Sequence, residues 1–394
     1  MTFEASKPSA IGAARQVHIY REGLAGHKPP FPISAAELTT QAYAVLPERI
    51  RAWLGGAGRE DTMRANRDAF DHWKIVPRML VDISNPDMSV DFLGRRIAAP
   101  VMLSPVGLQK VYHPDAELAS ARAAAALNLP FVLSNQSSVS IEEAAQHSGS
   151  GLRLFQMYWT KVPELTESIV RRAEAAGYSA IVLTVDTKLI GWREDILSLG
   201  YNPFFEGGGI AVYTSDPVFR AMLSRTPEED SVGAVEAFLK VFSNVSLSWR
   251  DLAWLRSKTT LPIFIKGIQH LDDAKQAIDE GARGIIVSNH GGRQVDGAIG
   301  SLDALEPVVK AVDGRIGIGF DSGVRGGADG FKALALGADV VGLGRLYIYG
   351  LALGGEAGVR HVLENFLCDL ELACVLSGCP NVSSVSREYV LEGR

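Results

Sequence analysis

The sequence predicts an α/β fold: a (β/α)8 TIM barrel with an N-terminal helical extension and a long loop after the fourth strand. Eight short apolar runs recur along the 394 residues, and segments with helical periodicity lie between them. Eight is the number of strands that closes a barrel of this type. The runs are apolar throughout, as expected for parallel strands that are covered on both faces. A doubly wound open sheet would produce the same pattern, so periodicity leaves both arrangements open.

The predicted strands are rich in β-branched and other apolar residues. They are PVMLS at 100–104, PFVLS at 130–134, RLFQMY at 153–158, AIVLTV at 180–185, PIFIK at 262–266, GIIVS at 284–288, RIGIGFD at 315–321 and DVVGL at 339–343. Segments rich in Ala, Glu and Arg separate several of these runs, as in residues 115–128, 162–177 and 272–282, and their apolar residues recur at helical spacing. The order and the spacing therefore match repeated strand–helix units.

Two stretches depart from this repeat. Residues 1–99 precede the first strand and include a helical stretch from about residue 39 to residue 71, and we expect them to form an extension packed on the barrel of residues 100–394. The second stretch is an insertion at about 188–248, which is rich in Gly and aromatic residues. Because long connections in compact domains are usually functional or mobile, we expect this insertion to form a lid over the barrel mouth. An excursion without a role at the site is the alternative.

The bulk composition bounds the function. With 47% hydrophobic and 21% charged residues, the chain suits one large domain. A formal net charge of −6 and a pI near 5.8 offer no electrostatic basis for binding nucleic acid or an anionic membrane, and no window approaches the roughly 18 apolar residues of a membrane span. Cys368, Cys374 and Cys379 lack metal-ligand spacing, so we expect buried or idle thiols and neither a disulfide nor a zinc site. Since no secretory leader is recognisable, the cytoplasm is the expected location.

Polar residues end the predicted strands. In a (β/α)8 barrel the chemistry lies at the C-terminal ends of the strands, and a purely structural scaffold has no reason to collect polar groups there. Loops are polar in general, so no single one of these residues is decisive. In chain order they are Ser104 and Pro105, Ser134, Gln156 and Tyr158, Thr184 and Asp186, Lys266, Ser288 and His290, Asp321 and Ser322, and Gly344 and Arg345.

The loops after the seventh and eighth strands predict a phosphate site. They read DSGVRGG at 321–327 and GLGR at 342–345. Glycines let backbone N–H groups approach an anion, and Arg325 and Arg345 add charge and forked donors. Two ordinary glycine turns with solvated arginines are the alternative. Lys266 ends an otherwise apolar strand, so we expect it to face a phosphate, a reduced flavin or a carboxylate unless its side chain extends to the rim.

His290 and Arg293 lie three residues apart in SNHGGRQVDG, the most specific stretch of the chain. The imidazole can take a proton, and the guanidinium can hold a carboxylate through two parallel hydrogen bonds. Because a nearby cation depresses the pKa of a histidine, a base at this place needs a compensating carboxylate. Asp186 is the candidate that orients the imidazole and stabilises its protonated form. A histidine with a structural role is the alternative.

Five separated motifs in the right order resemble the FMN-dependent L-2-hydroxy acid oxidases and dehydrogenases. The resemblance extends from about residue 42 to residue 384, and residues 20–32, GWR at 191–193 and SDPVF at 215–219 are most similar to lactate 2-monooxygenase. The five motifs are LTVDT at 183–187, the Lys-Gly pair at 266–267, SNHGGRQ at 288–294, DSGVRGG at 321–327 and ALGADVVGLGR at 335–345.

The resemblance implies that the chain binds FMN, acts on a small-molecule 2-hydroxy acid with O2, and forms a homo-oligomer, a tetramer or an octamer. It implies that His290 removes a proton from the substrate with the help of Asp186 while the flavin is reduced. Arg293 and Arg193 would hold the substrate carboxylate, and Tyr158 would bond near the reacting hydroxyl. These assignments define the expected catalytic and substrate-binding residues.

The resemblance also implies a cofactor site. Lys266 would lie by the flavin ring and stabilise the negative charge of its reduced form. The positions that line the ring and the ribityl chain are Pro105, Val106, Gly107, Ser134, Gln156, Thr184 and Ser288, and those at the ribityl and phosphate end are Asp321, Gly323, Arg325, Gly344 and Arg345.

Four residues depart from the family pattern. Trp53 occupies the position of a tyrosine that helps to bind the substrate carboxylate, and its indole offers only an N–H group. Gln136 lies where the family has a tryptophan or an apolar residue. Gly326 replaces a second arginine of the phosphate loop and Leu346 replaces a proline, but neither change removes a group that phosphate binding requires. Trp53 and Gln136 therefore predict a pocket shaped for a different acid. A shift of the alignment at the Gly-rich turn after Trp53, which is one residue shorter than in the family, is the alternative.

The sequence thus predicts FMN-dependent oxidation of an L-2-hydroxy acid to the 2-keto acid, with re-oxidation of the flavin by O2. Oxidative decarboxylation, as in lactate 2-monooxygenase, is a further outcome, and Gly107 resembles that enzyme and some dehydrogenases. A dehydrogenase with another electron acceptor and a flavin-binding protein with little turnover are the alternatives. A different FMN barrel, such as a type 2 isopentenyl diphosphate isomerase or a dihydroorotate dehydrogenase, is disfavoured by the pair of His290 and Arg293.

Overall fold

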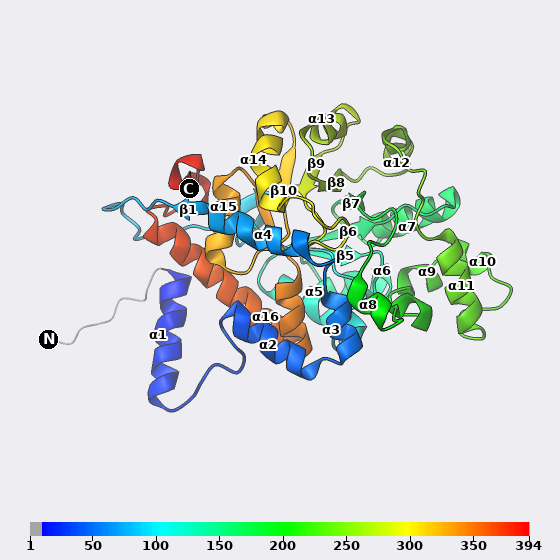
Figure 1. The fold of residues 1–394 in the computed structure, drawn as a ribbon, viewed down its shortest axis with the longest axis horizontal. Helices are drawn as coiled ribbons and strands as arrows, with labels where there is room; N and C mark the ends of the chain where they lie inside the picture. The colour runs from blue at the N-terminus through cyan, green and yellow to red at the C-terminus, as the bar shows by residue number, and fades with distance from the viewer. Residues whose placement is uncertain (1–9, 394) are drawn as a thin grey trace.

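Eight parallel strands close into a barrel in the computed structural model, which describes residues 10–393 (Figure 1). The strand order around the barrel is β10-β11-β4-β5-β6-β7-β8-β9. The strands are β4 (Val101–Leu103), β5 (Phe131–Ser134), β6 (Arg153–Met157), β7 (Ile181–Thr184), β8 (Ile263–Ile268), β9 (Gly284–Val287), β10 (Gly317–Phe320) and β11 (Val340–Leu343). Each strand lies within or overlaps a predicted run, so the (β/α)8 prediction is confirmed and the open doubly wound sheet is wrong.

A helix follows each barrel strand and covers the outside of the sheet (Figure 1). The last helix is kinked, since Gly354 and Gly355 have non-helical backbone angles and Gly355 has a φ of 56°. The eight helices are α5 (Ala116–Ala126), α6 (Ile141–Ser148), α7 (Pro163–Ala175), α12 (Leu252–Lys258), α13 (Leu271–Asp279), α14 (Ser301–Val312), α15 (Gly327–Ala335) and α16 (Arg345–Leu376).

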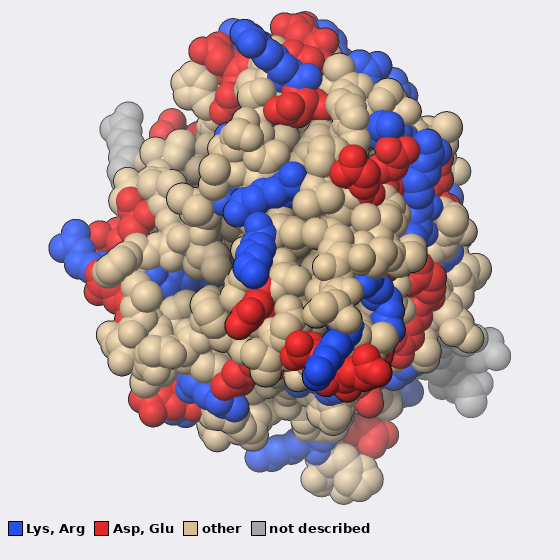
Figure 2. Space-filling model, turned by 90° about the vertical axis from the view of Figure 1, so that its right-hand side faces the viewer, with Lys and Arg blue, Asp and Glu red and all other residues tan. Residues whose placement is uncertain are grey.

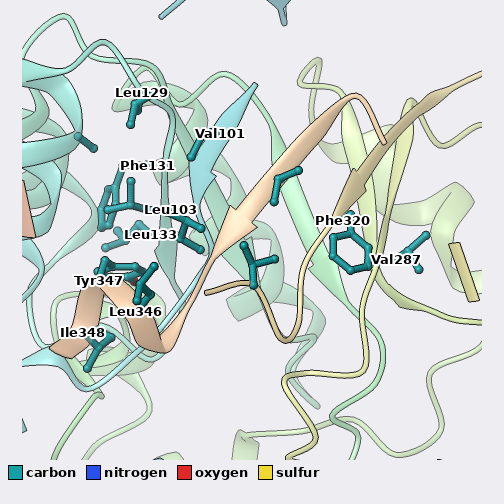
Figure 3. Packing of buried hydrophobic residues seen from close by; sticks show 14 of the residues in the cluster. Val101, Leu103, Leu129, Phe131, Leu133, Val287, Phe320, Leu346, Tyr347 and Ile348 are labelled. Atoms are coloured by element: carbon teal, nitrogen blue, oxygen red, sulfur yellow. The ribbon is translucent and has the colours of Figure 1, made fainter. Parts of the chain in front are cut away.

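The core has an inner and an outer layer because alternate residues of each strand point to opposite faces. Along β4, Val101 and Leu103 pack in the outer cluster, which includes Tyr347 of α16, whereas Met102 belongs to a separate inner cluster (Figure 3). A hairpin of β2 (Val90–Phe92) and β3 (Arg95–Ile97) packs against the inner cluster. Each fully buried Leu, Val or Phe contributes roughly 1.5–3 kcal/mol. The two layers therefore hold the strand ends in fixed positions.

The N-terminal segment contains α1 (Ile11–Leu24), α2 (Ala35–Val45), α3 (Glu48–Leu54) and α4 (Asp61–His72). The predicted helical stretch from about residue 39 to residue 71 consists of three helices, because Pro47 and a turn with Gly58 at a φ of 50° interrupt it. After α4, β1 (Trp73–Ile75) pairs with β12 (Val390–Glu392) from the other end of the chain. The division at residue 99 stays a prediction, since the two parts share this sheet.

The insertion after β7 is largely helical. Its elements are α8 (Glu194–Ser198), η2 (Pro203–Glu206), α9 (Ala211–Thr214), α10 (Pro217–Ala221) and α11 (Ser231–Val241), and η3 (Trp249–Asp251) follows before α12. Tyr213, Phe219 and Phe238 are fully buried, and the ring centroids of Tyr213 and Phe238 are 4.9 Å apart. These three rings belong to the same hydrophobic cluster as the outer layer of the barrel, which fixes the segments of the insertion that reach the barrel mouth.

Acidic and basic side chains are interspersed on the face that carries α10 and α11 (Figure 2). None of the helices within residues 10–393 combines the length and the apolar character that a membrane span requires. Cys374 and Cys379 are buried and Cys368 is half-buried, and all three are free thiols.

Candidate active site

The C-terminal ends of the barrel strands open into one cavity. Strand pairing places predicted residues side by side, with Ser134 next to Gln156 and Thr184 next to Lys266. The predicted site residues that line the cavity are Trp53, Pro105, Val106, Gly107, Ser134, Tyr158, Arg193, Lys266, His290, Arg293, Asp321, Gly323, Arg325, Gly344 and Arg345. The other four predicted residues, Gln156, Thr184, Asp186 and Ser288, do not line this cavity but hydrogen-bond to lining residues or neighbour them in the barrel.

His290 and Asp186 form a close pair. The Nδ1 atom of His290 lies 2.8 Å from Oδ1 of Asp186, and the hydroxyl of Thr187 donates to the same carboxylate oxygen at 2.7 Å. His290 has a φ of 58°, a left-handed conformation that is uncommon outside glycine, and its N–H donates to Oγ of Ser288 at 3.1 Å. Such backbone strain is typical of functional sites.

The charges around this pair define its protonation. Burial raises the pKa of Asp186, but His290 and Lys266 oppose this effect and hold the pKa at about 2. Burial lowers the pKa of His290, and Asp186 offsets only part of that shift. Since the ionised carboxylate only accepts hydrogen bonds, Nδ1 carries the proton and Nε2 keeps a free lone pair. His290 is therefore a neutral imidazole at neutral pH, able to take a proton at Nε2.

Lys266 is 3% exposed and lies among three polar groups. Its Nζ donates to Oγ of Ser288 at 2.9 Å and lies 3.9 Å from Oδ2 of Asp186 and 3.6 Å from Oδ2 of Asp321. The alternative that the side chain of Lys266 extends to the rim is therefore wrong. The carboxylates of Asp186 and Asp321 therefore hold the buried ammonium at the cavity, away from solvent.

Four buried or half-buried arginines give the cavity a positive charge. Within residues 10–393, the guanidinium groups of these arginines donate hydrogen bonds to carbonyl or amide oxygens, and the four residues are Arg193, Arg293, Arg325 and Arg345. Burial lowers the pKa of Arg193 to about 10. Burial is also the largest cause that lowers the pKa of Arg293, and the charges of Arg193 and Arg345 add to it. Cations without a carboxylate partner in a cavity favour the binding of anions. The site is thus built for more than one anionic group.

Trp53 contacts two of these cations. The guanidinium carbons of Arg193 and Arg293 are 5.2 and 5.4 Å from the centroid of the indole ring, within the range of a cation–π contact. On another side the indole makes an edge-to-face contact with Phe204 of the insertion. Trp53 therefore contacts both arginines and the insertion.

The residues fit an FMN group. Nε2 of Gln156 and Oγ1 of Thr184 are buried and lack a hydrogen-bond partner within residues 10–393, as expected for atoms that bond a flavin ring. Gly323 has a φ of 88°, and a Cβ at this position would approach the carbonyl oxygen of Asn66 to 2.7 Å. The helices α15 and α16 begin directly after these loops, and helix N-termini favour phosphate. Ring-binding and phosphate-binding groups are therefore both present.

Sequence reasoning missed several lining residues. Tyr112, Ile190, Phe204 and Phe242 line the cavity but were not predicted as site residues. Three of them belong to the insertion, whose residues have no strand register that would place them. Thr187 lines the cavity as well, and its position directly after Asp186 in LTVDT was a signal that could have identified it.

These features define a flavin-dependent oxidoreductase on a (β/α)8 barrel. The chain matches the family described as FMN-dependent dehydrogenase over residues 42–392, and it belongs to that family. FMN is its cofactor, and the family resemblance predicted from the sequence is confirmed. Its class of reaction is the oxidation or dehydrogenation of 2-hydroxy acids.

Relatives with known names support this assignment. The chain is 43% identical to an L-lactate oxidase of Lysinibacillus sphaericus over 90% of this chain and 92% of the relative. It is 42% identical to the FMN-dependent alpha-hydroxy acid dehydrogenase qulF of Penicillium citrinum over 95% of this chain and 94% of the relative. A crystal structure of mandelate oxidase superimposes with a TM-score of 0.82 at 37% identity and covers 92% of this chain and 99% of the other.

Proposed function

We propose that the protein oxidises an L-2-hydroxy acid to the 2-keto acid and passes the electrons to O2, which yields hydrogen peroxide. The main support for this proposal is the pair of His290 and Asp186. Asp186 holds Nδ1 of the neutral imidazole, so Nε2 is free to act as a base in a cavity that Arg193 and Arg293 also line. A base and a carboxylate-binding pair at one site are what removal of a proton from a 2-hydroxy acid requires. The names of the lactate oxidase and mandelate oxidase relatives support O2 as the acceptor.

The side chains divide the work as follows. Arg293 and Arg193 bind the carboxylate, and Tyr158 donates a hydrogen bond to the 2-hydroxyl, since burial raises its pKa and keeps its phenol protonated. Nε2 of His290 takes the proton, and Asp186 stabilises the resulting imidazolium. FMN, when bound, accepts the two electrons that leave the substrate carbon.

The cofactor contacts follow from the lining of the cavity. We propose that Lys266, held between two carboxylates, stabilises negative charge on the reduced ring. The other ring-side residues are Pro105, Val106, Gly107, Ser134, Gln156, Thr184 and Ser288, and the ribityl and phosphate end is held by Asp321, Gly323, Arg325, Gly344 and Arg345.

Decarboxylation is a second outcome of the same chemistry. If the insertion with Phe204 and Phe242 retains the keto acid after oxidation, peroxide attacks it and releases CO2, as in lactate 2-monooxygenase. A dehydrogenase that uses another acceptor is supported by the name of the Penicillium relative. We favour the oxidase, because relatives similar in sequence and relatives similar in structure both include proteins named as oxidases.

Product analysis tests this proposal. The FMN-loaded protein is incubated in air with L-lactate and with (S)-mandelate, and the keto acid, peroxide and CO2 are measured. The proposal expects keto acid and peroxide in equal amounts. Carbon dioxide in place of peroxide identifies the monooxygenase, and turnover only with an added dye identifies the dehydrogenase. Failure of every 2-hydroxy acid to turn over under any of these conditions contradicts the proposal.

We also propose a homo-oligomer in the cytoplasm. The segment after β1 leaves Met79 and Leu80 exposed, together with half-exposed Val81 and Ile83, and such apolar patches mark interfaces. The free thiols are consistent with a reducing compartment. Light scattering of the purified protein at micromolar concentration tests the assembly, and a monomer contradicts it.

A further inference from the structure

The loop that carries His290 has an unusual backbone. His290, Gly291 and Gly292 follow one another with φ values of 58°, 66° and 73°. Two of the three are glycines, which adopt this left-handed region freely, whereas a histidine does not. A residue other than glycine persists in such a conformation only where the surrounding structure holds it there. The position of the imidazole therefore depends on the contacts that fix this loop.

A pair of buried asparagines connects the loop with the N-terminal segment. Nδ2 of Asn66, in α4, donates to Oδ1 of Asn289 at 2.9 Å, and Nδ2 of Asn289 donates to Oδ1 of Asn66 at 2.7 Å. Oδ1 of Asn289 also accepts from the N–H of Gly292 at 3.1 Å. The side chain of Asn66 is thus bonded to the residue that directly precedes His290 and, through it, to Gly292. We call Asn66 and Asn289 the asparagine pair.

The other bonds of the asparagine pair keep it in one orientation. Nδ2 of Asn289 donates to the carbonyl of Ile299 at 3.2 Å, and Oδ1 of Asn66 accepts from the N–H of Ser301, the first residue of α14, at 2.9 Å. Asn66 is 1% exposed, and Asn289 is buried as well. A buried amide that moves leaves polar groups unpaired, which costs free energy. The asparagine pair is therefore a rigid support for the loop.

The same face of α4 contacts the loop a second time. Thr62 lies four residues before Asn66, and residues at this spacing share one face of a helix. The hydroxyl of Thr62 donates to the carbonyl of Val295 at 2.8 Å and accepts from the N–H of Ala298 at 2.8 Å. Two successive turns of α4 are therefore bonded to the loop, and the turn with Asn66 reaches the residue next to His290.

The helix α4 also lies against the phosphate loop. A Cβ at Gly323 would approach the carbonyl oxygen of Asn66 to 2.7 Å. Arg67 donates to the carbonyl of Gly323 and, at 2.6 Å, to the carboxylate of Asp329. A substitution in α4 can therefore affect the cofactor end of the cavity, so FMN content has to be measured apart from the rate.

We propose that Asn66 is a positioning residue for the base: paired with Asn289, it holds the left-handed backbone at His290 and keeps the imidazole between Asp186 and the cavity. This inference rests on the proposed oxidation of 2-hydroxy acids. Asn66 does not line the cavity, so it acts on the reaction only through the loop.

The substrate carboxylate should depend less on Asn66. Arg293 belongs to the same loop, but its guanidinium donates to the carbonyls of Trp53 and Gly55 at 2.6 and 2.7 Å. These bonds fix its position independently of the asparagine pair. Loss of Asn66 should therefore slow proton removal by His290 more than it weakens substrate binding.

Anaerobic stopped-flow measurement on Asn66→Ala tests this division. L-lactate and (S)-mandelate are used over a range of concentrations, which gives the limiting rate of flavin reduction per bound FMN and the Kd of the substrate. Because a displacement of about 1 Å can cost about 100-fold in rate, we expect the limiting rate to fall about 10- to 100-fold and the Kd to change by less than about threefold. Asp68→Ala, at an exposed position of the same helix, is the matched control and should change neither value.

Hydrogen exchange provides a readout that requires no turnover. The N–H of Gly292 donates to the amide oxygen of Asn289, so its exchange with solvent reports opening of the loop. Mass spectrometry of the peptide that covers residues 289–294 should show exchange about tenfold faster in Asn66→Ala than in the native protein. Asp68→Ala should exchange at the native rate.

A double-mutant cycle separates the asparagine pair from general destabilisation. Because the two amides act as one unit, the variant with both Asn66→Ala and Asn289→Ala should reduce the flavin within about twofold of the slower single variant. Asn66→Ser, which keeps a hydroxyl at this place, replaces Asn66→Ala if the alanine variant does not fold.

Three outcomes overturn the inference. They are a limiting rate per bound FMN within about twofold of the native value, which would confine Asn66 to a structural role; unchanged exchange of the loop; and losses that multiply in the double variant. The proposed function fails separately, since it fails only if no 2-hydroxy acid reduces the flavin of the native protein.

Discussion

Asp186→Asn removes the carboxylate that lies against both His290 and Lys266. Oδ1 of Asp186 is 2.8 Å from Nδ1 of His290, and Oδ2 is 3.9 Å from Nζ of Lys266. Burial alone would raise the pKa of this carboxyl, yet its cationic neighbours lower it from 3.8 to about 2. A pKa of about 2 in place of 3.8 corresponds to roughly 2 kcal/mol of net stabilisation of the ionised form.

The imidazolium that forms when His290 takes a proton loses the same interaction in the variant. We therefore expect the rate of flavin reduction to fall by one to two orders of magnitude, since each 1.36 kcal/mol on the barrier is tenfold in rate. FMN content should stay close to that of the native protein, because Asp186 does not line the cavity. Anaerobic stopped-flow measurement of the visible flavin absorbance gives the rate, and Asp272→Asn on the exposed face of α13 is the matched control.

The same substitution has a pH signature. The folded pKa of Asp186 lies below the unfolded value, so its contribution to stability is present above a pH near 3.8 and is lost as the pH falls toward about 2. The native protein should lose this contribution in that window, and Asp186→Asn should not. Flavin reduction within threefold of the native rate at full FMN occupancy would refute the assignment of Asp186 as the partner of the base.

Three further predictions follow from other contacts. Lys266→Met leaves the buried carboxylates of Asp186 and Asp321 without their cation and should lower the free energy of unfolding by about 3 kcal/mol. The midpoint of urea unfolding measures this change, and an unchanged midpoint would contradict the buried ion pairs. Burial raises the pKa of Glu117 from 4.5 to about 7, and the N–H groups of Ser138 and Gln109 offset only part of this effect. The free energy of unfolding should therefore decrease by about 3 kcal/mol as the pH rises from 4.5 to 7, and Glu117→Gln should remove this pH dependence. Trp53→Tyr should lower KM for lactate several-fold by supplying a hydroxyl, and a higher KM would show that the indole itself is required.

The barrel could be predicted from the sequence because its strands are wholly apolar. A run such as IVLT in β7 is buried on both faces, so composition alone identifies it, and the polar residue that follows each run marks the end that carries the site. The pairing of His290 with Asp186 was accessible for the same reason, since both residues follow strand ends.

The insertion and the N-terminal segment could not be predicted to the same depth. Phe204 and Phe242 reach the cavity through the packing of α11 and η2, and no periodicity in the sequence reports such contacts. The helical stretch from residue 39 to residue 71 is interrupted at Pro47, which has no backbone N–H to continue a helix and directly precedes α3. The pairing of β1 with β12 joins residues more than 300 positions apart, and three-residue strands carry too little pattern to be recognised.

Anaerobic titration of the FMN-loaded protein with an L-2-hydroxy acid tests the central claim most directly. The account predicts that the flavin absorbance bleaches with formation of one equivalent of 2-keto acid, and that His290→Ala keeps FMN but loses this bleaching by several orders of magnitude in rate. If the native protein binds FMN but no 2-hydroxy acid bleaches it, or if His290→Ala bleaches at the native rate, the account is contradicted.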